Sequence, residues 1–283
     1  MPDRTVPIVA LATGANQGLG FAMVEALCQA LPPDAVIYLS ARDAGRGEAA
    51  VAELAGRGRS AVFLPLDVSS EESVAHAAAA ILRRHGGIDI VISNAAARIS
   101  RDRPQAEQVA GFIDTNNHGT YRVIRAFQPL LRDNARFLVV ASSFGSLTRL
   151  PAHLHPLFDV TTRSLEDIEA LMDDYVRLVQ SGRDREQGWP EWMNIASKVG
   201  QVASAKILAR TMRAEAQARG ILINAVCPGL VDTAASRPWF DDMSAAQSPA
   251  AAAVDPVWLA TRPPGTTAPY GELVRHREVF PWQ

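Results

Sequence analysis

The sequence predicts an α/β protein with a doubly wound parallel sheet of about seven strands, covered by helices on both faces. Short runs of apolar residues alternate with helical segments through the first half of the chain, and a glycine-rich turn follows the first run. Continuous apolar strands are typical of parallel sheets that are buried on both faces. Right-handed crossovers between such strands place helices on both sides of the sheet.

The strands and helices of the first half are read from apolar runs, turn residues and helical periodicity. PIVALAT, IDIVIS and ARFLVVA are continuous apolar strands, and the Ala-rich segment after Ser70 is a helix. We expect strands over residues 7–13, 35–40, 61–66, 88–93 and 135–141. We expect helices over residues 18–30, 71–85 and 105–132.

The second half contains a long polar excursion before the next helix. Residues 147–190 are expected to form an insertion, with a helix over 164–180 whose apolar residues recur at helical spacing. A helix over 191–218, a strand over 221–227 and a mixed segment over 244–264 follow, and residues 273–280 are expected to close the sheet. We interpret residues 1–283 as one domain with this insertion packed on it.

Composition narrows the classes of function. The 28 basic and 30 acidic residues give a net charge of −2, which argues against a protein that binds nucleic acid or a membrane surface by charge. Cys28 and Cys227 suggest neither a disulfide framework nor a metal site. No signal peptide and no membrane-spanning run are recognised, so a cytoplasmic enzyme is expected. Lysine occurs only at Lys198 and Lys206, which makes each of them conspicuous.

A glycine-rich turn, TGANQGLG, joins the first strand to the first helix. Its glycines permit a tight turn and close approach of the backbone to a pyrophosphate, which the helix N-terminus attracts. The placement favours a Rossmann dinucleotide site over a plain structural turn. The expected cofactor-binding residues here are Gly14, Asn16, Gln17, Gly18, Leu19 and Gly20.

The end of the second strand indicates which dinucleotide is bound. Arg42 occupies this position and Asp43 follows it. An acidic residue here would accept hydrogen bonds from the ribose of NAD, whereas an arginine pairs with the 2′-phosphate of NADP. We therefore expect NADP(H); the alternative is a solvated arginine at the start of a helix.

Several further motifs complete a pattern that extends over essentially the whole chain. They are LDV at 66–68, NAA at 94–96, TNNHGT at 115–120, ASS at 141–143, WMNIASK at 192–198, PGLVDT at 228–233 and PYGELV at 269–274. With the glycine-rich turn and the segment SARDAGRG, they resemble the short-chain dehydrogenase/reductase family, specifically its monomeric carbonyl-reductase-like branch. The resemblance implies a monomer, because the insertion covers the helix face that other members use to dimerise.

The resemblance also implies roles for individual residues. Asp67 and Val68 would contact the adenine, Asn94 and Ala95 would complete the cofactor site, and Lys198 would bind the nicotinamide ribose. The loop that would hold the nicotinamide carboxamide contributes Pro228, Gly229, Val231 and Thr233. Ser143 would hydrogen-bond the reacting oxygen, and Asn116 would hold a water that feeds protons along the helix.

The sequence departs from the family pattern at one catalytic position. The family has a tyrosine acid/base four residues before the lysine, and this chain has Asn194 there. A carboxamide does not exchange a proton near neutral pH, although it can still donate a hydrogen bond to an oxygen. Positioned acid–base catalysis contributes roughly 10²–10⁴-fold to a rate, so its loss must change the reaction or be compensated.

Three interpretations of Asn194 remain open. The first is a reductase of an activated C=C, C=N or C=O in a hydrophobic small molecule. The second is a surrogate acid. The third is a redox-neutral enzyme, such as an isomerase or cyclase, or an NADP(H)-binding protein without catalysis. An introduced substitution would also explain the asparagine. The candidate surrogates are His118, His153, His155, Asp159, Tyr175 and Glu191.

No metal ligand set is assigned, because the loop histidines have no clear third partner. Aromatic residues of the insertion and of the loop after Thr233 either wall an apolar pocket or pack in the core; these are Trp189, Trp192, Trp239, Phe240 and Met243.

Overall fold

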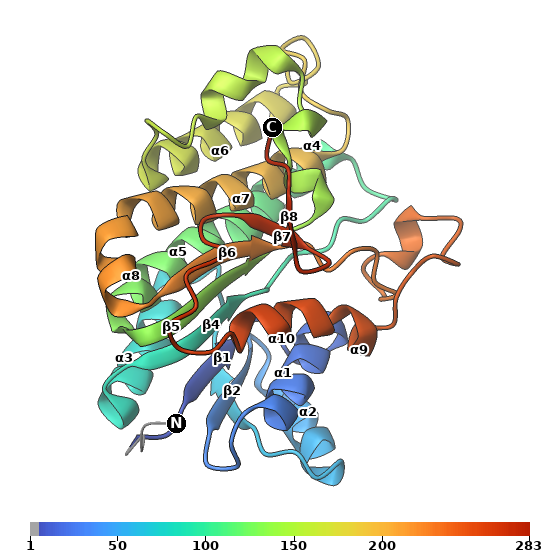
Figure 1. Ribbon diagram of the computed structural model, residues 1–283. Helices are drawn as coiled ribbons and strands as arrows, with labels where there is room; N and C mark the ends of the chain where they lie inside the picture. Colours follow the sequence, from blue (N-terminus) through green and yellow to red (C-terminus); the bar gives the residue numbers. More distant parts are fainter. Residues whose placement is uncertain (1–5) are drawn as a thin grey trace.

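The computed structural model describes residues 6–283, and its centre is one eight-stranded sheet between two layers of helices (Figure 1). The strand order is β3-β2-β1-β4-β5-β6-β7-β8, and only the β7–β8 pair is antiparallel. The strands are β1 (Val9–Ala12), β2 (Val36–Ala41), β3 (Val62–Pro65), β4 (Ile88–Ser93), β5 (Leu131–Val140), β6 (Leu222–Val226), β7 (Leu273–Arg275) and β8 (Glu278–Phe280). The doubly wound α/β prediction is therefore confirmed.

The helices cover both faces of the sheet and also extend beyond it. They are α1 (Gly18–Ala30), α2 (Ala44–Gly56), α3 (Glu71–His85), α4 (Gln105–Ile113), α5 (Gly119–Phe127), α6 (Leu165–Gln180), α7 (Met193–Thr211), α8 (Arg213–Arg219), α9 (Pro249–Ala252) and α10 (Val254–Ala260). In the part of the chain that the structure describes, no helix combines the length and the apolar character needed to cross a membrane.

Alternate residues of each central strand enter two different cores, as the side-chain period of two requires. On β1, Val9 and Leu11 pack against α3, α5 and α7, whereas Ala10 and Ala12 pack against α1, α2 and α10. The order of the strands reverses between β1 and β4. Ligands of such sheets bind outside the carboxyl ends of the strands at this switch point, so the fold itself indicates where a site forms.

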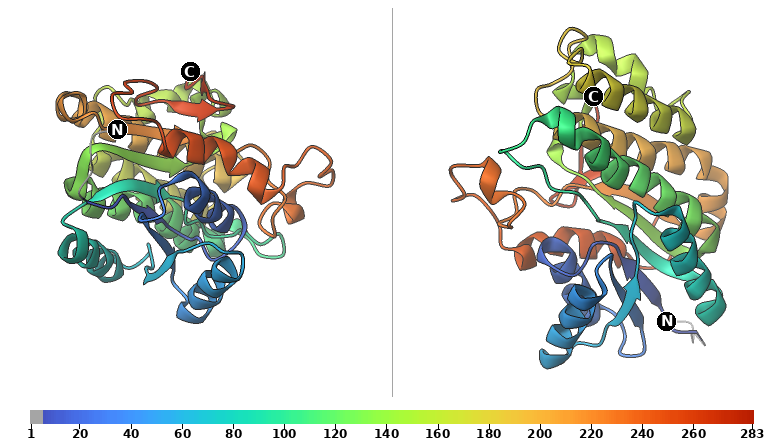
Figure 2. Two further views of the ribbon diagram at one scale, coloured as in Figure 1. Left: turned by 60° about the horizontal axis from the view of Figure 1, so that its bottom comes forward. Right: turned by 180° about the vertical axis from the view of Figure 1, so that it is seen from behind.

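The segment expected to be an insertion contributes α6, which lies outside α4 and α7 and far from the sheet (Figures 1 and 2). Helix α6 begins with a capping box, in which Ser164 Oγ accepts from Asp167 N at 3.1 Å and Asp167 Oδ2 accepts from Ser164 N at 2.8 Å. The apolar residues of α6 join a third core with α4 and with one face of α7 from Met193 to Ile207. A reciprocal cap and an apolar face explain why the periodicity of residues 164–180 predicted this helix well.

Residues 105–132, expected as one helix, form several elements. Helix α4 continues into a π-helical turn, Asp114–His118, and then into α5. Pro129 lies in a short 3₁₀ turn, Gln128–Leu130, directly after α5, and β5 begins at Leu131. The last part of the prediction was wrong, because proline lacks the N–H that a continuing helix needs.

Residues 273–280 close the sheet as expected, but as two strands, so that the sheet has eight strands where about seven were expected. Residues 273–280 form a hairpin, β7–β8, that turns at His276 and Arg277 with φ angles of 52° and 63°. Two-residue hairpin turns of this kind favour Asn-Gly or Asp-Gly. A His-Arg turn carries no such signal in the sequence.

Two further differences concern helices. The helix expected over 191–218 begins at Met193 and is divided at Met212 into α7 and α8. Helix α2 was not among the expected elements, although Asp43 provides its N-cap by accepting from Arg46 N at 2.8 Å.

Candidate active site

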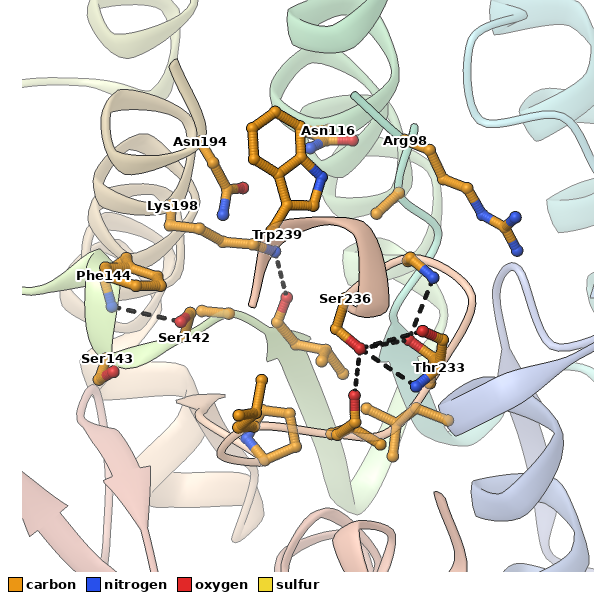
Figure 3. A pocket seen from close by; sticks show the side chains of 18 of the residues that line it. Arg98, Asn116, Ser142, Ser143, Phe144, Asn194, Lys198, Thr233, Ser236 and Trp239 are labelled. Atoms are coloured by element: carbon orange, nitrogen blue, oxygen red, sulfur yellow. Dashed lines mark hydrogen bonds between the residues drawn. The ribbon is translucent and has the colours of Figure 1, made fainter. Parts of the chain in front are cut away.

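A cavity of about 400 Å³ opens at the carboxyl ends of the strands, on the side of the switch point between β1 and β4 (Figure 3). All four residues expected to be catalytic line it: Asn116, Ser143, Asn194 and Lys198. The expected cofactor residues Leu19, Asn94, Pro228, Gly229, Val231 and Thr233 line it as well. The structure therefore gathers residues that are more than 200 positions apart in the sequence, from Leu19 to Thr233.

The other expected cofactor residues do not line this cavity. They lie at or just beyond the ends of β1, β2, β3 and β4, along the same edge of the sheet, and are Gly14, Asn16, Gln17, Gly18, Gly20, Arg42, Asp67, Val68 and Ala95. The expected cofactor residues therefore follow the carboxyl edge of the sheet, from the cavity at one end to Arg42 and Asp67 at the other.

The glycine-rich turn allows a close approach of backbone segments. Gly14 has φ +61°, and a Cβ there would lie 2.7 Å from Ala95 Cα. A Cβ on Gly20 would lie 2.5 Å from the carbonyl oxygen of Gly14. Gln17, at the N-cap of α1, gives no side-chain cap, so the first N–H groups of this helix remain available to an anion.

Asn94 holds this turn in place. Its Nδ2 donates to the carbonyl oxygens of Thr13 at 2.9 Å and Gly14 at 3.2 Å. In return, Thr13 Oγ1 accepts from the backbone N–H groups of Asn94 and Ala95, both at 2.9 Å. These contacts fit a preformed cradle for a pyrophosphate, which is the group that the turn is expected to bind.

Arg42 is exposed at the end of β2, and the described residues provide it with no ion-pair partner. The neighbouring carboxylate of Asp43 is engaged as the N-cap of α2 and accepts from Arg46 N. Asp67, after β3, accepts from Ser69 N at 3.0 Å and Ser69 Oγ at 2.7 Å. Among the described residues, no carboxylate pairs with the exposed guanidinium of Arg42 at this end of the sheet edge.

Lys198 and Asn194 lie one turn apart on α7, so that both side chains reach the cavity from the same face of the helix (Figure 3). Lys198 Nζ donates to Gln201 Oε1 at 2.7 Å and to the carbonyl oxygen of Val140 at 3.3 Å. Burial lowers the pKa of Lys198 from 10.5 to about 8. The carboxamide of Asn194 has no hydrogen-bond partner among residues 6–283 and points into the cavity.

Asn116 lies on the π-helical turn between α4 and α5 and is buried. Its side-chain oxygen accepts from Ala97 N at 2.8 Å. Its backbone carbonyl accepts from Thr120 Oγ1 at 2.6 Å and from Gln201 Nε2 at 2.9 Å. A carbonyl oxygen has two lone pairs, and protein donors already approach this one from two side chains.

Ser143 begins the 3₁₀ turn Ser143–Gly145 that follows β5. Ser142 is the N-cap of this turn and accepts from Phe144 N at 3.3 Å, whereas the hydroxyl of Ser143 has no partner among the described residues. Both serines line the cavity.

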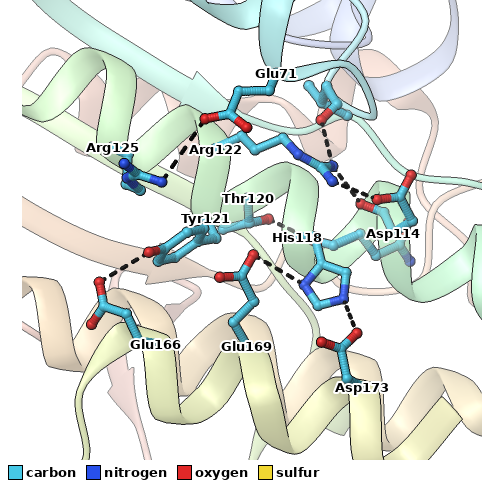
Figure 4. Close-up of polar contacts among 12 residues, drawn as sticks. Glu71, Asp114, His118, Thr120, Tyr121, Arg122, Arg125, Glu166, Glu169 and Asp173 are labelled. Carbon is cyan, nitrogen blue, oxygen red and sulfur yellow. Dashed lines mark hydrogen bonds and ion pairs between the residues drawn. The ribbon is translucent and has the colours of Figure 1, made fainter. Parts of the chain in front are cut away.

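None of the candidate surrogate acids lines the cavity. His118 faces α6 instead, where its Nδ1 and Nε2 lie 3.4 Å from Glu169 Oε1 and 3.0 Å from Asp173 Oδ1 (Figure 4). Tyr175 is buried in the third core, and burial raises its pKa. Asp159 is held by Thr161 and Thr162, whose hydrogen bonds lower its pKa to about 2.

The remaining candidates are also engaged elsewhere. His153 contacts the carbonyl oxygen of Gln187 at 3.0 Å, and His155 contacts that of Leu150 at 2.9 Å. Glu191 is exposed and lies 3.6 Å from Arg185. Within residues 6–283, no three His, Cys, Asp or Glu side chains gather as a metal site would require.

The charged groups that line the cavity are all cationic among the described residues: Arg98, Lys198 and Arg275. The cavity wall is otherwise mainly apolar, with aromatic rings from Phe112, Phe144, Trp192, Trp239 and Phe240. Trp192 packs against Phe144 and Trp239, with ring centroids 5.1 and 5.4 Å apart. Because burial lowers the pKa of Lys198 to about 8, the charge of this lining side chain changes closer to neutral pH than that of an exposed lysine.

The aromatic residues named from the sequence divide between wall and core. Trp192, Trp239 and Phe240 line the cavity, whereas Trp189 packs in the third core between Phe158 and Tyr175. Met243 does not line the cavity. The sequence reasoning missed Arg98, Phe144, Gln201 and Arg275, because nothing in their spacing marks them; proximity to the NAA and ASS motifs is the one signal available for Arg98 and Phe144.

The chain is similar to known proteins over nearly its whole length. The family model described as short chain dehydrogenase matches residues 8–152. Carbonyl reductase (NADPH) 1 of Mus musculus is 34% identical over 278 residues, which cover 97% of this chain and 98% of the mouse protein. Carbonyl reductase (NADPH) 3 of Rattus norvegicus is 33% identical over the same length and coverage.

Solved structures show the same architecture. Salutaridine reductase from Papaver somniferum superposes with a TM-score of 0.80 at 22% identity, covering 94% of this chain and 99% of that one. Menthone neomenthol reductase from Mentha piperita has a TM-score of 0.77 at 25% identity, covering 96% of this chain and 99% of that one.

Proposed function

Because this chain belongs to the short-chain dehydrogenase/reductase family and is an oxidoreductase of that family, we propose that it is an NADPH-dependent reductase of activated double bonds in hydrophobic small molecules. The preferred acceptor in this proposal is a C=C bond conjugated to a carbonyl. A C=N or an activated C=O bond is the next most suitable acceptor.

The choice of cofactor rests on three supports. The first is that the names of the carbonyl reductases similar to this chain specify NADPH. The second is the glycine-rich turn with an uncapped helix N-terminus, which fits a pyrophosphate. The third is Arg42, which lies free where a 2′-phosphate would be bound. When bound, NADPH supplies a hydride for transfer to an electrophilic carbon.

The observation that carries the proposed reaction is the set of groups around Asn194. This set contains hydrogen-bond donors and cations but no tyrosine, histidine or carboxylic acid among the described residues. Asn194, Ser143 and Lys198 are suited to stabilise negative charge on a substrate oxygen. Asn194 and Ser143 are poorly suited to delivering a proton in the same step, and Lys198 could deliver one only by losing the charge that stabilises the oxygen.

Addition of a hydride to the β-carbon of an enone matches this set. The negative charge then develops on the enolate oxygen, which the donors stabilise, and water supplies the proton to the α-carbon afterwards. The products are the saturated ketone and NADP⁺. An iminium cation fits less well, because Arg98, Lys198 and Arg275 would repel it.

The substrate is proposed to be apolar or aromatic next to its reacting bond. The cavity of about 400 Å³ and its wall of aromatic rings favour such a molecule. We further propose that residues 1–283 act as one catalytic unit and as a monomer in the cytoplasm. The cover that α6 provides over α4 and α7, and the free thiols of Cys28 and Cys227, support this part of the proposal.

The test is the oxidation of NADPH, followed by absorbance, with an enone, a ketone and a cyclic imine of matched carbon skeleton. Turnover selective for the enone is the expected result. Selective turnover of the simple ketone would contradict the assigned role of Asn194. If the panel gives no turnover while NADPH binds, the alternative is a redox-neutral enzyme or a binding protein without catalysis.

A further inference from the structure

Gln201 does not line the cavity, yet it connects Lys198 to the helices on the other side of α7. Its side chain is buried, with 2% of its surface exposed. Gln201 Oε1 accepts from Lys198 Nζ at 2.7 Å. Gln201 Nε2 donates to the backbone carbonyl of Asn116 at 2.9 Å and to Thr120 Oγ1 at 3.1 Å.

The orientation of this carboxamide is determined by its neighbours. The oxygen and nitrogen of a glutamine can exchange places, and the hydrogen-bond network decides between the two orientations. Here the Asn116 carbonyl can only accept, and Thr120 gives its own proton to that carbonyl at 2.6 Å, so the Thr120 oxygen accepts as well. The nitrogen end of the amide therefore faces two acceptors, and Gln201 must present its oxygen to Lys198.

We propose that Gln201 is a positioning residue that fixes the Lys198 ammonium at the end of β5 and favours its charged form. Because its orientation is fixed, Gln201 offers only its oxygen to Lys198. This oxygen accepts a hydrogen bond from the ammonium, but it has no hydrogen to donate to the lone pair of a neutral amine. This bond is charge-assisted and therefore stronger than one between neutral groups. The catalytic meaning of this role rests on the proposed function, but the contact itself does not.

Some of the other groups that face Lys198 raise its pKa and others lower it. Val140 provides a second acceptor at 3.3 Å, and the charge interaction with the Cys227 thiol raises the pKa of Lys198. Desolvation lowers it, and Arg98 and Arg275, which line the same cavity, add positive charge. An ammonium has three N–H donors, so the bonds to Gln201 and Val140 leave one for a ligand in the cavity.

The chain offers a direct measurement, because Lys198 and Lys206 are its two lysines. Protein labelled with ¹³C at lysine Cε gives two signals, and the variant Lys206→Arg assigns them. The pH titration of the Lys198 signal then reports its pKa without cofactor or substrate. Lys206, paired with Glu272 at 2.9 Å, is an internal reference.

The variant Gln201→Met removes the acceptor at similar side-chain length. We expect it to lower the pKa of Lys198 by about 1–2 units, because a hydrogen bond to a charged group has about that strength. The variant Gln201→Glu keeps an oxygen next to the ammonium and adds negative charge, so it should raise the pKa above that of the unsubstituted protein.

The matched control is Ser197→Ala. It removes a buried hydrogen bond, from Ser197 Oγ to Asn117 Oδ1 at 2.8 Å, at the same contact between α7 and the π-helical turn, without touching Lys198. The control should leave the Lys198 titration unchanged. An unchanged titration in Gln201→Met, or an equal shift in Ser197→Ala, would overturn the proposal.

If Gln201→Met does not fold, the proposal is tested with Gln201→Glu alone. A Lys198 pKa that does not rise in this variant would contradict the role of Gln201. Fluorescence titration of the same variants with NADPH gives a separate result. Absence of NADPH binding by the unsubstituted protein would count against the proposed function. The NMR titration would still test the positioning role of Gln201, because it needs no cofactor.

Discussion

Asn194 and Lys198 stand where the family resemblance leads one to expect a tyrosine and a lysine, and both line the cavity. Lys198 keeps a buried ammonium near the cavity, and Asn194 offers hydrogen-bond donors without an exchangeable proton. The expected roles of Ser143, Asn116 and the cofactor residues remain predictions. Their positions around one cavity or along one sheet edge are what those roles require.

The clearest prediction at the residue scale concerns Asn194→Tyr. A phenol four residues before Lys198 would restore a proton donor next to the ammonium, so reduction of the matched ketone should rise by roughly 10²–10⁴-fold in kcat/KM. NADPH oxidation measures the change. Asn194→Phe is the control, since it has a ring of similar size and no hydroxyl. Equal ketone activity in both variants would refute the proposed role of position 194.

A second prediction concerns pH. Burial lowers the pKa of Lys198 to about 8, so the ammonium predominates below that pH and the neutral amine above it. Both an anionic cofactor and a developing enolate favour the cation. The kcat/KM for the enone should therefore be constant at lower pH and fall as pH rises through about 8. Lys198→Met should remove this dependence together with most of the activity; a profile that rises through this range would contradict the assignment.

A third prediction tests Arg42. If its guanidinium binds the 2′-phosphate, Arg42→Ala should weaken NADPH binding by about 10–100-fold and leave NADH binding nearly unchanged. Fluorescence titration with both nucleotides gives the ratio. Arg46→Ala, which removes an exposed neighbour that contacts Asp43 at 3.9 Å, is the matched control. Loss of affinity for both nucleotides alike would point to a structural effect.

At the scale of elements, the helix that carries the site depends on a contact distant in sequence. Gln105, at the start of α4, accepts from Met193 N at 2.9 Å and donates to the carbonyl oxygen of Glu191 at 2.6 Å. It thus satisfies a free N–H of the first turn of α7, for which Trp192 provides no side-chain cap. The segment before α7 and the start of α4 are therefore held together, directly beside Asn194.

Helix α6 supplies the prediction at this scale. Ser164→Ala removes the capping box and should destabilise the protein by about 1 kcal/mol, measured by urea denaturation. Ser181→Ala, at the other end of the helix, loses one exposed hydrogen bond to the carbonyl oxygen of Leu178 and should cost less. An effect of Ser164→Ala no greater than that of Ser181→Ala would show that tertiary packing, and not the cap, determines where α6 begins.

At the scale of the whole molecule, α6 forms an additional layer over α4 and α7. Its polar side also reaches the π-helical turn and α5, where Tyr121 donates to Glu166 at 2.9 Å and His118 lies between Glu169 and Asp173 (Figure 4). Through these polar contacts and its apolar core, α6 covers the outer surface of α4 and α7.

The corresponding prediction is a monomer. Light scattering after size-exclusion chromatography should give a mass near 30.4 kDa that does not change with protein concentration. A mass that rises toward twice this value on concentration would contradict the expectation. The test would then be repeated with Ile168→Asp, which disturbs the apolar side of α6 in the third core, and with Glu166→Gln, which disturbs its polar contact with Tyr121.

By itself, the sequence determined the alternating strands and helices, the glycine-rich turn and the insertion helix, and it named the four candidate residues that line one cavity: Asn116, Ser143, Asn194 and Lys198. Each depends on local patterns: apolar runs, helical periodicity, a cap or a motif of adjacent residues. The tertiary structure alone decided the β7–β8 turn, the capping of α7 by Gln105, the positions of the candidate surrogate acids outside the cavity and the bond between Gln201 and Lys198. The physical reason is that these features join residues across the fold, and a hydrogen-bond partner is chosen by distance and orientation in space, which spacing along the chain does not specify.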